Sequence, residues 1–228
     1  MGKHVYEAMK ATIPVMMGYI VLGFALGMLL QKNGYGWGYA LLMSGLIYAG
    51  SMQFVAIDLL AGGASLISAA LMTMVVNARH IVYGLSMIGK FKKMGSYKPY
   101  MIFSLTDETY SLLVGAKTPE GCEEKKFLFL VSLLDQCYWV LGSVAGSLIG
   151  SMLTINTTGL DFAMTALFVV IVVEQFFTSN RHRYSYLGFG VSAICLLFFG
   201  SASFLIPSMI GIGIGLSWLY GKEGKARE

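Results

Sequence analysis

The feature that most restricts the fold of this chain is a series of long apolar runs, several reaching the ~20 residues that a helix needs to cross a bilayer. Residues 11–30 and 127–153 together contain a single charged side chain, Asp135. Helices of soluble proteins instead alternate apolar and polar faces. Charged residues make up 12% of the chain, which is about half the usual share of a soluble domain. We therefore predict an all-α polytopic membrane protein that forms a single domain over residues 1–228 and has the lipid bilayer as its surroundings.

The apolar runs number about eight. They lie near residues 11–30, 38–60, 64–89, 99–116, 127–153, 160–178, 186–202 and 204–220. The connections between them are short, so no soluble domain fits. Pro207 separates or kinks the last two runs, because proline lacks the backbone N–H that a helix interior needs.

The distribution of lysine and arginine predicts the orientation, since cytoplasmic loops are enriched in both. Lys3 and Lys10 place the N-terminus in the cytoplasm of a multi-pass plasma-membrane protein. With eight full spans, the basic loop 117–126 and the basic C-terminal tail would also be cytoplasmic. Residues 89–98, however, contain four lysines and would then lie outside.

Two interpretations of this conflict stay open. We predict eight full spans and keep one alternative, in which segments 38–60 and 99–116 enter the membrane and return without crossing it. Re-entrant or broken helices are tolerated only where they are buried in protein or line a wet cavity. Both segments carry unusual polar content, which is why they are the candidates.

A weak two-fold internal repeat also emerges. The sequence LGFALG at residues 22–27 resembles LGSVAG at residues 141–146, and Gln53-Phe54 has a counterpart in Gln175-Phe176. Transporters are often built from such repeats, although Gly- and Leu-rich helices also resemble one another by chance. The small residues of GSVAGSLIGS predict a ridge for close helix packing.

The polar group Asn77, Arg79 and His80 lies in the middle of run 64–89. An arginine facing lipid at a helix centre costs from ~3 to more than 10 kcal/mol. Arg79 must therefore face protein or a water-filled cavity and have a partner. It either meets a substrate or pins two helices together through a carboxylate.

Segment 99–116 supplies the carboxylates that could pair with Arg79. Helical spacing places several polar residues on one face, namely Ser104, Asp107, Glu108 and Ser111. Adjacent carboxylates in an apolar run repel each other, so one of them can exchange a proton. The alternative is that Thr106-Asp107 caps a short helix that begins in mid-segment.

Segment 38–60 adds further candidates. Its helical spacing predicts one stripe of Ser44, Tyr48, Ser51 and Asp58, and places Gln53 on a face of small residues. Ser51 and Gln53 are candidate binding residues. An interhelical hydrogen bond is the alternative role for Gln53.

Five stretches in order along the chain resemble the AzlC-type family, the large subunits of branched-chain amino acid exporters. These are YAGSMQFVAIDLLAGGAS, NARHIVYGLS, TDETYSLL, WVLGSVAGSLIG and GLDFAMTALFVVIVVEQ. The likeness extends from about residue 11 to residue 220. It implies export of leucine, isoleucine, valine and toxic analogues, together with a small AzlD-type membrane partner. Methionine is an alternative substrate.

The residues agree with this resemblance in kind. A zwitterionic amino acid needs a cationic group for its carboxylate and an anionic group for its ammonium. The candidate binding residues are Ser51, Gln53, Asn77, Arg79, His80, Asp107 and Glu108. The candidate proton carriers are His80, Asp107 and Glu108. No GxxxxGK[ST] phosphate loop is present, so we expect secondary transport.

Three other classes are weighed against a carrier. An intramembrane enzyme lacks support because neither HExxH nor GxSxG occurs. A channel would use the same buried charges, although no TVGYG filter is present. A purely structural subunit would have no use for costly buried charges. We expect no cofactor, no metal and no nucleic-acid partner, since the three cysteines are widely spaced and the net charge of +4 is small.

Overall fold

The computed structural model describes residues 2–152 and 182–225, with a few isolated positions between these ranges. Every regular element within them is a helix, which confirms the all-α prediction. The chain divides into two compact units, Met1–Met164 and Thr165–Glu228, and each is considered by itself. Most of the predicted sixth segment, 160–178, lies outside the described residues, and so does Gln175 of the predicted repeat.

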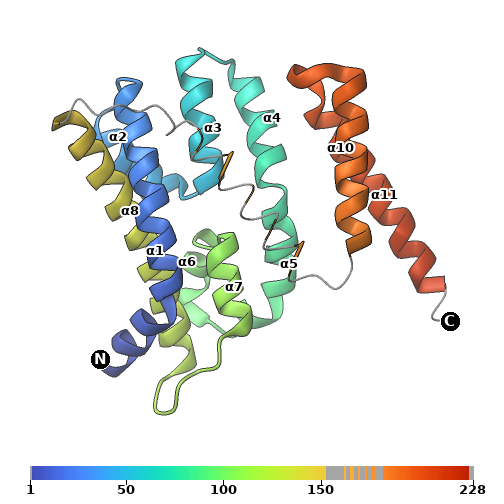
Figure 1. The fold of residues 1–228 in the computed structure, drawn as a ribbon. Helices are drawn as coiled ribbons and strands as arrows, with labels where there is room; N and C mark the ends of the chain where they lie inside the picture. Colours follow the sequence, from blue (N-terminus) through green and yellow to red (C-terminus); the bar gives the residue numbers. More distant parts are fainter. Residues whose placement is uncertain are drawn as a thin grey trace. The chain divides into compact units, whose positions relative to one another are not determined.

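The first unit has a long helix at each end of its sequence and shorter helices between them (Figure 1). Its helices are α1 (Gly2–Lys32), α2 (Trp37–Leu42), α3 (Gly50–Ala61), α4 (Leu66–Asn77), α5 (Arg79–Phe91), α6 (Lys98–Phe103), α7 (Asp107–Gly115) and α8 (Glu124–Met152). A π-helical turn, Met43–Ile47, continues α2, and a short 3-10 turn, Gly95–Tyr97, precedes α6.

Helices α1 and α8 run parallel and pack with their backbones in contact. A Cβ atom on Gly142 would lie 2.7 Å from the carbonyl oxygen of Ile20, and one on Gly23 would lie 2.9 Å from that of Trp139. Gly146 faces the backbone of α1 in the same way. The predicted ridge of small residues is thereby confirmed as a packing surface. The two similar stretches, 22–27 and 141–146, face each other, but an internal repeat is not confirmed.

Segment 38–60 is interrupted and folds back on itself. The π-helical turn ends at Tyr48, whose φ of 46° and ψ of 48° lie in the left-handed region that side chains rarely adopt. The tip of this hairpin reaches the middle of α8, where Gln136 Nε2 donates to the carbonyl oxygen of Gly45 at 2.9 Å. Gly50, the first residue of α3, lies against the ring of Trp139. Helix α3 then returns toward the end of the unit from which α2 came (Figure 1).

Segment 99–116 forms a second hairpin, which enters from the opposite end. Helix α6 contacts α8, because the Tyr100 hydroxyl donates to Gln136 Oε1 at 2.6 Å. After a break at residues 104–106, α7 runs back beside α5, and Lys90 Nζ donates to the carbonyl oxygen of Leu113 at 2.5 Å. The two tips meet where Tyr48 packs against Phe103, with ring centroids 6.4 Å apart.

Both interruptions correct the helical faces predicted for these segments. The stripe through Ser44, Tyr48, Ser51 and Asp58 is wrong, because Ser44 and Ser51 lie on opposite sides of the break. The face that joined Ser104 to Asp107 is wrong for the same reason, since α6 ends at Phe103. The predicted cap at Thr106 is confirmed: its hydroxyl accepts from the backbone N–H of Thr109 at 3.2 Å.

Three lysine-bearing segments gather at one end of the first unit. The backbone N–H of Glu123 donates to His4 Nε2 at 3.0 Å, which ties the N-terminus to the loop before α8. His4, Tyr97 and Lys126 line one common cavity, which adds the stretch between α5 and α6 to this group. The basic stretches that conflicted under eight full spans therefore lie together.

Among the described helices, three are long and apolar enough to cross a membrane. These are α1, α8 and residues His182–Gly200 of α10 (His182–Ser203). Helices α4 and α5, bent by 51° at Ala78, reach the necessary length as a pair. The prediction of eight full spans is not confirmed.

The second unit contains α10 and α11 (Leu205–Lys225), which pack against each other. Gly211 lies against Val191 and Gly215 lies against Leu187, so the two helices run antiparallel. Pro207 lies in the first turn of α11, where its missing N–H costs no helical hydrogen bond.

Candidate functional site

The starts of three helices converge on Arg79. This residue begins α5 immediately after the bend at Ala78, and its guanidinium forms an ion pair with Asp107, the first residue of α7. Its other terminal nitrogen donates to the hydroxyl of Ser51, in the first turn of α3. The positive ends of helix dipoles favour anions, so these helix starts and the guanidinium together favour a carboxylate ligand.

Several buried polar atoms around this ion pair have no partner. They are Arg79 Nε, Asp107 Oδ1 and Asn77 Oδ1. Native proteins pair almost all of their buried polar atoms, so unpaired ones indicate a place for water or a ligand. The structure thus brings together Ser51, Asn77, Arg79 and Asp107 of the predicted site, and it leaves hydrogen-bonding capacity free there.

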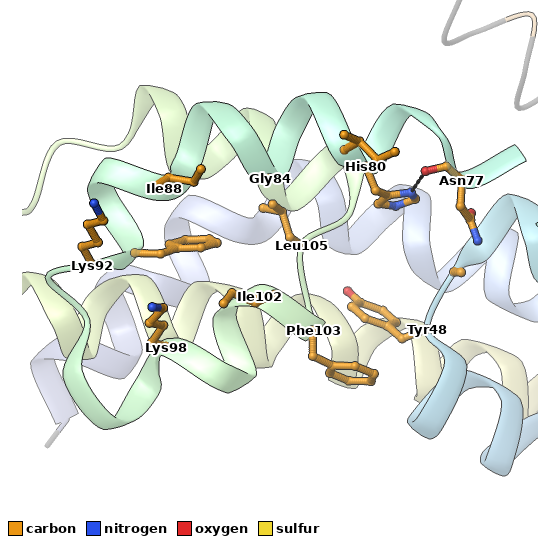
Figure 2. A pocket seen from close by; sticks show the side chains of 13 residues that line it. Tyr48, Asn77, His80, Gly84, Ile88, Lys92, Lys98, Ile102, Phe103 and Leu105 are labelled. Carbon is orange, nitrogen blue, oxygen red and sulfur yellow. Dashed lines mark hydrogen bonds between the residues drawn. The ribbon is translucent and has the colours of Figure 1, made fainter. Parts of the chain in front are cut away.

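A cavity of about 640 Å³ lies beside this cluster (Figure 2). His80 and Asn77 line one end of it, opposite Tyr48 from the first hairpin, whereas Lys92 and Lys98 line the other end. The wall between them is apolar and comes from Ile81, Gly84, Ile88, Phe91, Ile102, Phe103 and Leu105. Binding pockets commonly combine such apolar walls with a few convergent polar groups.

His80 is held by its own helix turn. Its Nδ1 lies 3.1 Å from the carbonyl oxygen of Asn77, and its ring meets the edge of Tyr83 at a centroid distance of 6.1 Å. The remaining nitrogen, Nε2, is therefore the one available to a ligand or a proton. Among the described residues, no group of three His, Cys, Asp or Glu side chains could hold a metal ion.

Gln53 is occupied by protein on both sides of its amide. Trp139 Nε1 donates to Gln53 Oε1 at 2.8 Å, and Gln53 Nε2 donates to Ser44 Oγ at 3.3 Å. The side chain is fully buried. These bonds match the alternative role that the sequence left open for Gln53, an interhelical hydrogen bond.

Glu108 faces away from Arg79 toward α1. Its Oε2 lies 2.8 Å from the hydroxyl of Tyr19, which in turn lies 2.6 Å from Thr106 Oγ1. Farther along, the Thr109 hydroxyl donates to Asp135 Oδ2 on α8 at 2.8 Å. The sequence analysis noted Asp135 as a lone charge in an apolar run without giving it a role. It missed Tyr19 and Thr109, because isolated hydroxyls in apolar helices are too common to single out.

The AzlC protein family model matches residues 14–153 of the chain. A membrane protein of Helicobacter pylori is 42% identical over 204 residues, which cover 90% of each chain. The branched-chain amino acid transport protein AzlC of Bacillus subtilis is 41% identical over 206 residues, covering 90% of this chain and 81% of that protein. The inner membrane protein YgaZ of Escherichia coli is 29% identical over 177 residues, 75% of this chain and 72% of its own length. No solved structure matches.

Proposed function

The chain belongs to the AzlC family, and on this premise we propose that it is a secondary transporter exporting branched-chain amino acids across the plasma membrane. The name of the Bacillus subtilis relative supports the substrate class. The observation that carries the proposal is the meeting of Arg79 and Asp107 at three helix starts beside an apolar cavity.

The ion pair and the cavity match the parts of an amino acid. The substrate carboxylate binds Arg79 and the helix starts around it, and the substrate ammonium binds Asp107 or Glu108. Binding then exchanges partners within the site, because each half of the Arg79–Asp107 pair gains an opposite charge from the substrate. The aliphatic side chain occupies the cavity beside Ile81 and Ile88, with Asn77 and His80 at its polar end.

The two interrupted hairpins supply a route for alternating access. We infer that 38–60 and 99–116 are re-entrant, since each returns to the end of the unit where it entered. Broken helices in transporters bind substrates near mid-membrane in this way. The basic segments at one end support a cytoplasmic N-terminus. His80, Asp107 and Glu108 are the proton carriers that couple export to the proton gradient.

A second subunit completes the transporter. We propose a small AzlD-type membrane partner that packs on an apolar face of this chain, in keeping with the family resemblance. Many large apolar side chains of α4 and α5 are exposed in the isolated chain, among them Leu66, Met74 and Val82. Lipid covers whatever part of this surface the partner leaves free.

Counterflow of labelled leucine in proteoliposomes tests the proposal. The chain is reconstituted with and without the partner, as the native protein and as the Arg79→Gln variant. Lys93→Gln, which removes an exposed lysine near the end of α5, is the matched control. We expect uptake that needs the partner, is lost in Arg79→Gln and is kept in Lys93→Gln.

Other outcomes point elsewhere. Full uptake by a folded Arg79→Gln protein would remove Arg79 from the binding site. Counterflow of methionine but not leucine would change the substrate, and conductance without saturation would indicate a channel.

A further inference from the structure

Four short contacts connect two carboxyl groups that lie on different helices. Glu108 Oε2 is 2.8 Å from the Tyr19 hydroxyl, and that hydroxyl is 2.6 Å from Thr106 Oγ1. Thr106 Oγ1 is 3.1 Å from Thr109 Oγ1, which is 2.8 Å from Asp135 Oδ2. The series begins on α7, crosses α1, returns to the tip of the second hairpin and ends on α8. Thr106, Thr109 and Asp135 are buried.

Counting hydrogens shows that this series needs one more proton than its hydroxyls supply. It contains four oxygen–oxygen contacts and three hydroxyl groups. With both carboxylates ionised, Tyr19 donates to Glu108, Thr106 to Thr109, and Thr109 to Asp135. The contact between Tyr19 and Thr106 would then have no hydrogen, although its 2.6 Å length lies within the range of O–H···O hydrogen bonds. One proton on a terminal carboxyl group completes the series.

We propose that this series is a proton wire, in which a single shared proton resides on Glu108 or on Asp135. With the proton on Glu108, each group donates a hydrogen bond to the next one in the direction of Asp135. Glu108 donates to Tyr19 and Tyr19 to Thr106, after which Thr106 donates to Thr109 and Thr109 to Asp135. When Asp135 receives a proton from Thr109, each hydroxyl along the series gives its hydrogen to the next group and takes one from the group before it. Glu108 is then left ionised. The O–H bonds broken equal those formed, and the total charge is unchanged.

The wire rests on the proposed function and specifies its coupling. An ammonium group that binds beside Asp107 favours an ionised Glu108, so substrate binding drives the proton toward Asp135. Asp135 is fully buried, and its second oxygen, Oδ1, has no partner through which to lose the proton in this conformation. Because the links join α7 to α1 and α8, movement of the hairpin breaks the wire and isolates its two ends.

The groups around the wire are suited to this role. Arg79 and Asp107 are the charged groups close enough to act electrostatically on Glu108, and Tyr48 and Tyr100 are the titratable groups near Asp135. The Tyr48 hydroxyl is buried and has no hydrogen-bond partner. It offers an exit for the proton once the hairpin tips separate.

The first test separates proton movement from substrate exchange. In proteoliposomes containing the complete transporter, a trapped pH dye reports leucine-driven proton movement, and labelled leucine reports counterflow. Tyr19→Phe and Thr109→Val each remove one hydroxyl of the wire. We expect proton movement to fall at least about tenfold while counterflow persists. Tyr138→Phe is the matched control, because its buried hydroxyl contacts Thr12 at 3.2 Å and lies outside the wire. If either Tyr19→Phe or Thr109→Val fails to fold, the result of the other variant tests the wire.

A second test does not depend on transport. Infrared spectroscopy of the purified protein at neutral pH detects the C=O stretch of a protonated carboxyl group. We expect this band in the native protein, in which Glu108 or Asp135 holds the shared proton. It should be lost in both Glu108→Gln and Asp135→Asn, because in each variant the side-chain amide donates the fourth hydrogen and the remaining carboxyl group of the wire ionises.

The two tests distinguish the two proposals. The expected infrared pattern in a protein without leucine counterflow supports the wire and overturns the proposed substrate transport. Leucine-driven proton movement that survives both hydroxyl variants overturns the wire and leaves the transporter standing. A native protein without the protonated band also overturns the wire.

Discussion

Arg79 and Asp107 show how a buried charge is made tolerable by one specific partner. Their side chains are only 25% and 17% exposed, so each would be poorly solvated alone. Removing one half of a buried pair typically destabilises a protein by about 3–5 kcal/mol, because the other charge stays uncompensated.

A double-mutant cycle tests this dependence. We expect Arg79→Gln and Asp107→Asn each to lower the free energy of unfolding by about 3 kcal/mol, and the double variant to lose clearly less than the sum. Denaturant unfolding in detergent measures all four proteins. Glu123→Gln, which breaks the exposed pair with Lys126, is the control and should have no measurable effect. Strictly additive losses would show that Arg79 and Asp107 do not depend on each other.

The sequence predicted this pair and its neighbour Ser51, but it did not predict the hydroxyls that bond to the other buried carboxyl groups, Glu108 and Asp135. An arginine in an apolar run demands a carboxylate, and the adjacent runs offered few, which made Asp107 a natural candidate. Tyr19 and Thr109 gave no such signal, since a hydroxyl in a helix can be satisfied by a nearby backbone carbonyl, as Thr12 is by Ala8. Only the folded chain shows that theirs point at carboxylates instead.

At the level of whole helices, the sequence indicated that segments 38–60 and 99–116 could be interrupted, but it located only one of the two breaks. Thr106 is a strong N-cap residue, so a helix start there was foreseeable. The break at Tyr48 has no comparable signal, because a tyrosine in the left-handed region follows from the packing of the hairpin tip. Periodicity across that break therefore predicted a stripe that does not exist.

The contact between α1 and α8 leads to an element-level prediction. Gly146 faces the backbone of Phe24, and a side chain there would push the two helices apart. We expect Gly146→Ala to lower the free energy of unfolding by about 1–3 kcal/mol, as overpacking usually does. Gly18→Ala is the matched control, since a Cβ on Gly18 meets nothing within 4 Å. Unfolding in denaturant compares them, and equal stability of Gly146→Ala and the native protein would mean that the backbone contact is not needed.

For the molecule as a whole, length and hydropathy could not distinguish a full span from a hairpin that enters and returns. Segment 38–60 has 23 residues, enough for a crossing by length alone. The four lysines of residues 89–98 and the polar content of the two segments were the sequence signals against eight crossings, and the length of the apolar runs outweighed them. In the folded first unit, His4, Tyr97 and Lys126 line one cavity, so the three basic segments lie at the same end. This arrangement favours two segments that enter and return over eight crossings.

The resulting topology makes a prediction that hydropathy does not. If both hairpins return, one crossing, α4 with α5, separates the loop after α3 from the stretch after α5. In a chain with Cys122, Cys137 and Cys195 replaced by serine, a cysteine at Lys93 should react with a membrane-impermeant reagent only from the cytoplasmic side. A cysteine at Ala64 should react only from the other side; both positions are exposed. Right-side-out and inverted vesicles provide the two sides, and transport by each variant confirms its fold. Eight full spans predict the opposite at Lys93, because segment 38–60 would then be one further crossing before residues 89–98 and would place them outside. Labelling of Lys93→Cys from the exterior would therefore restore that interpretation.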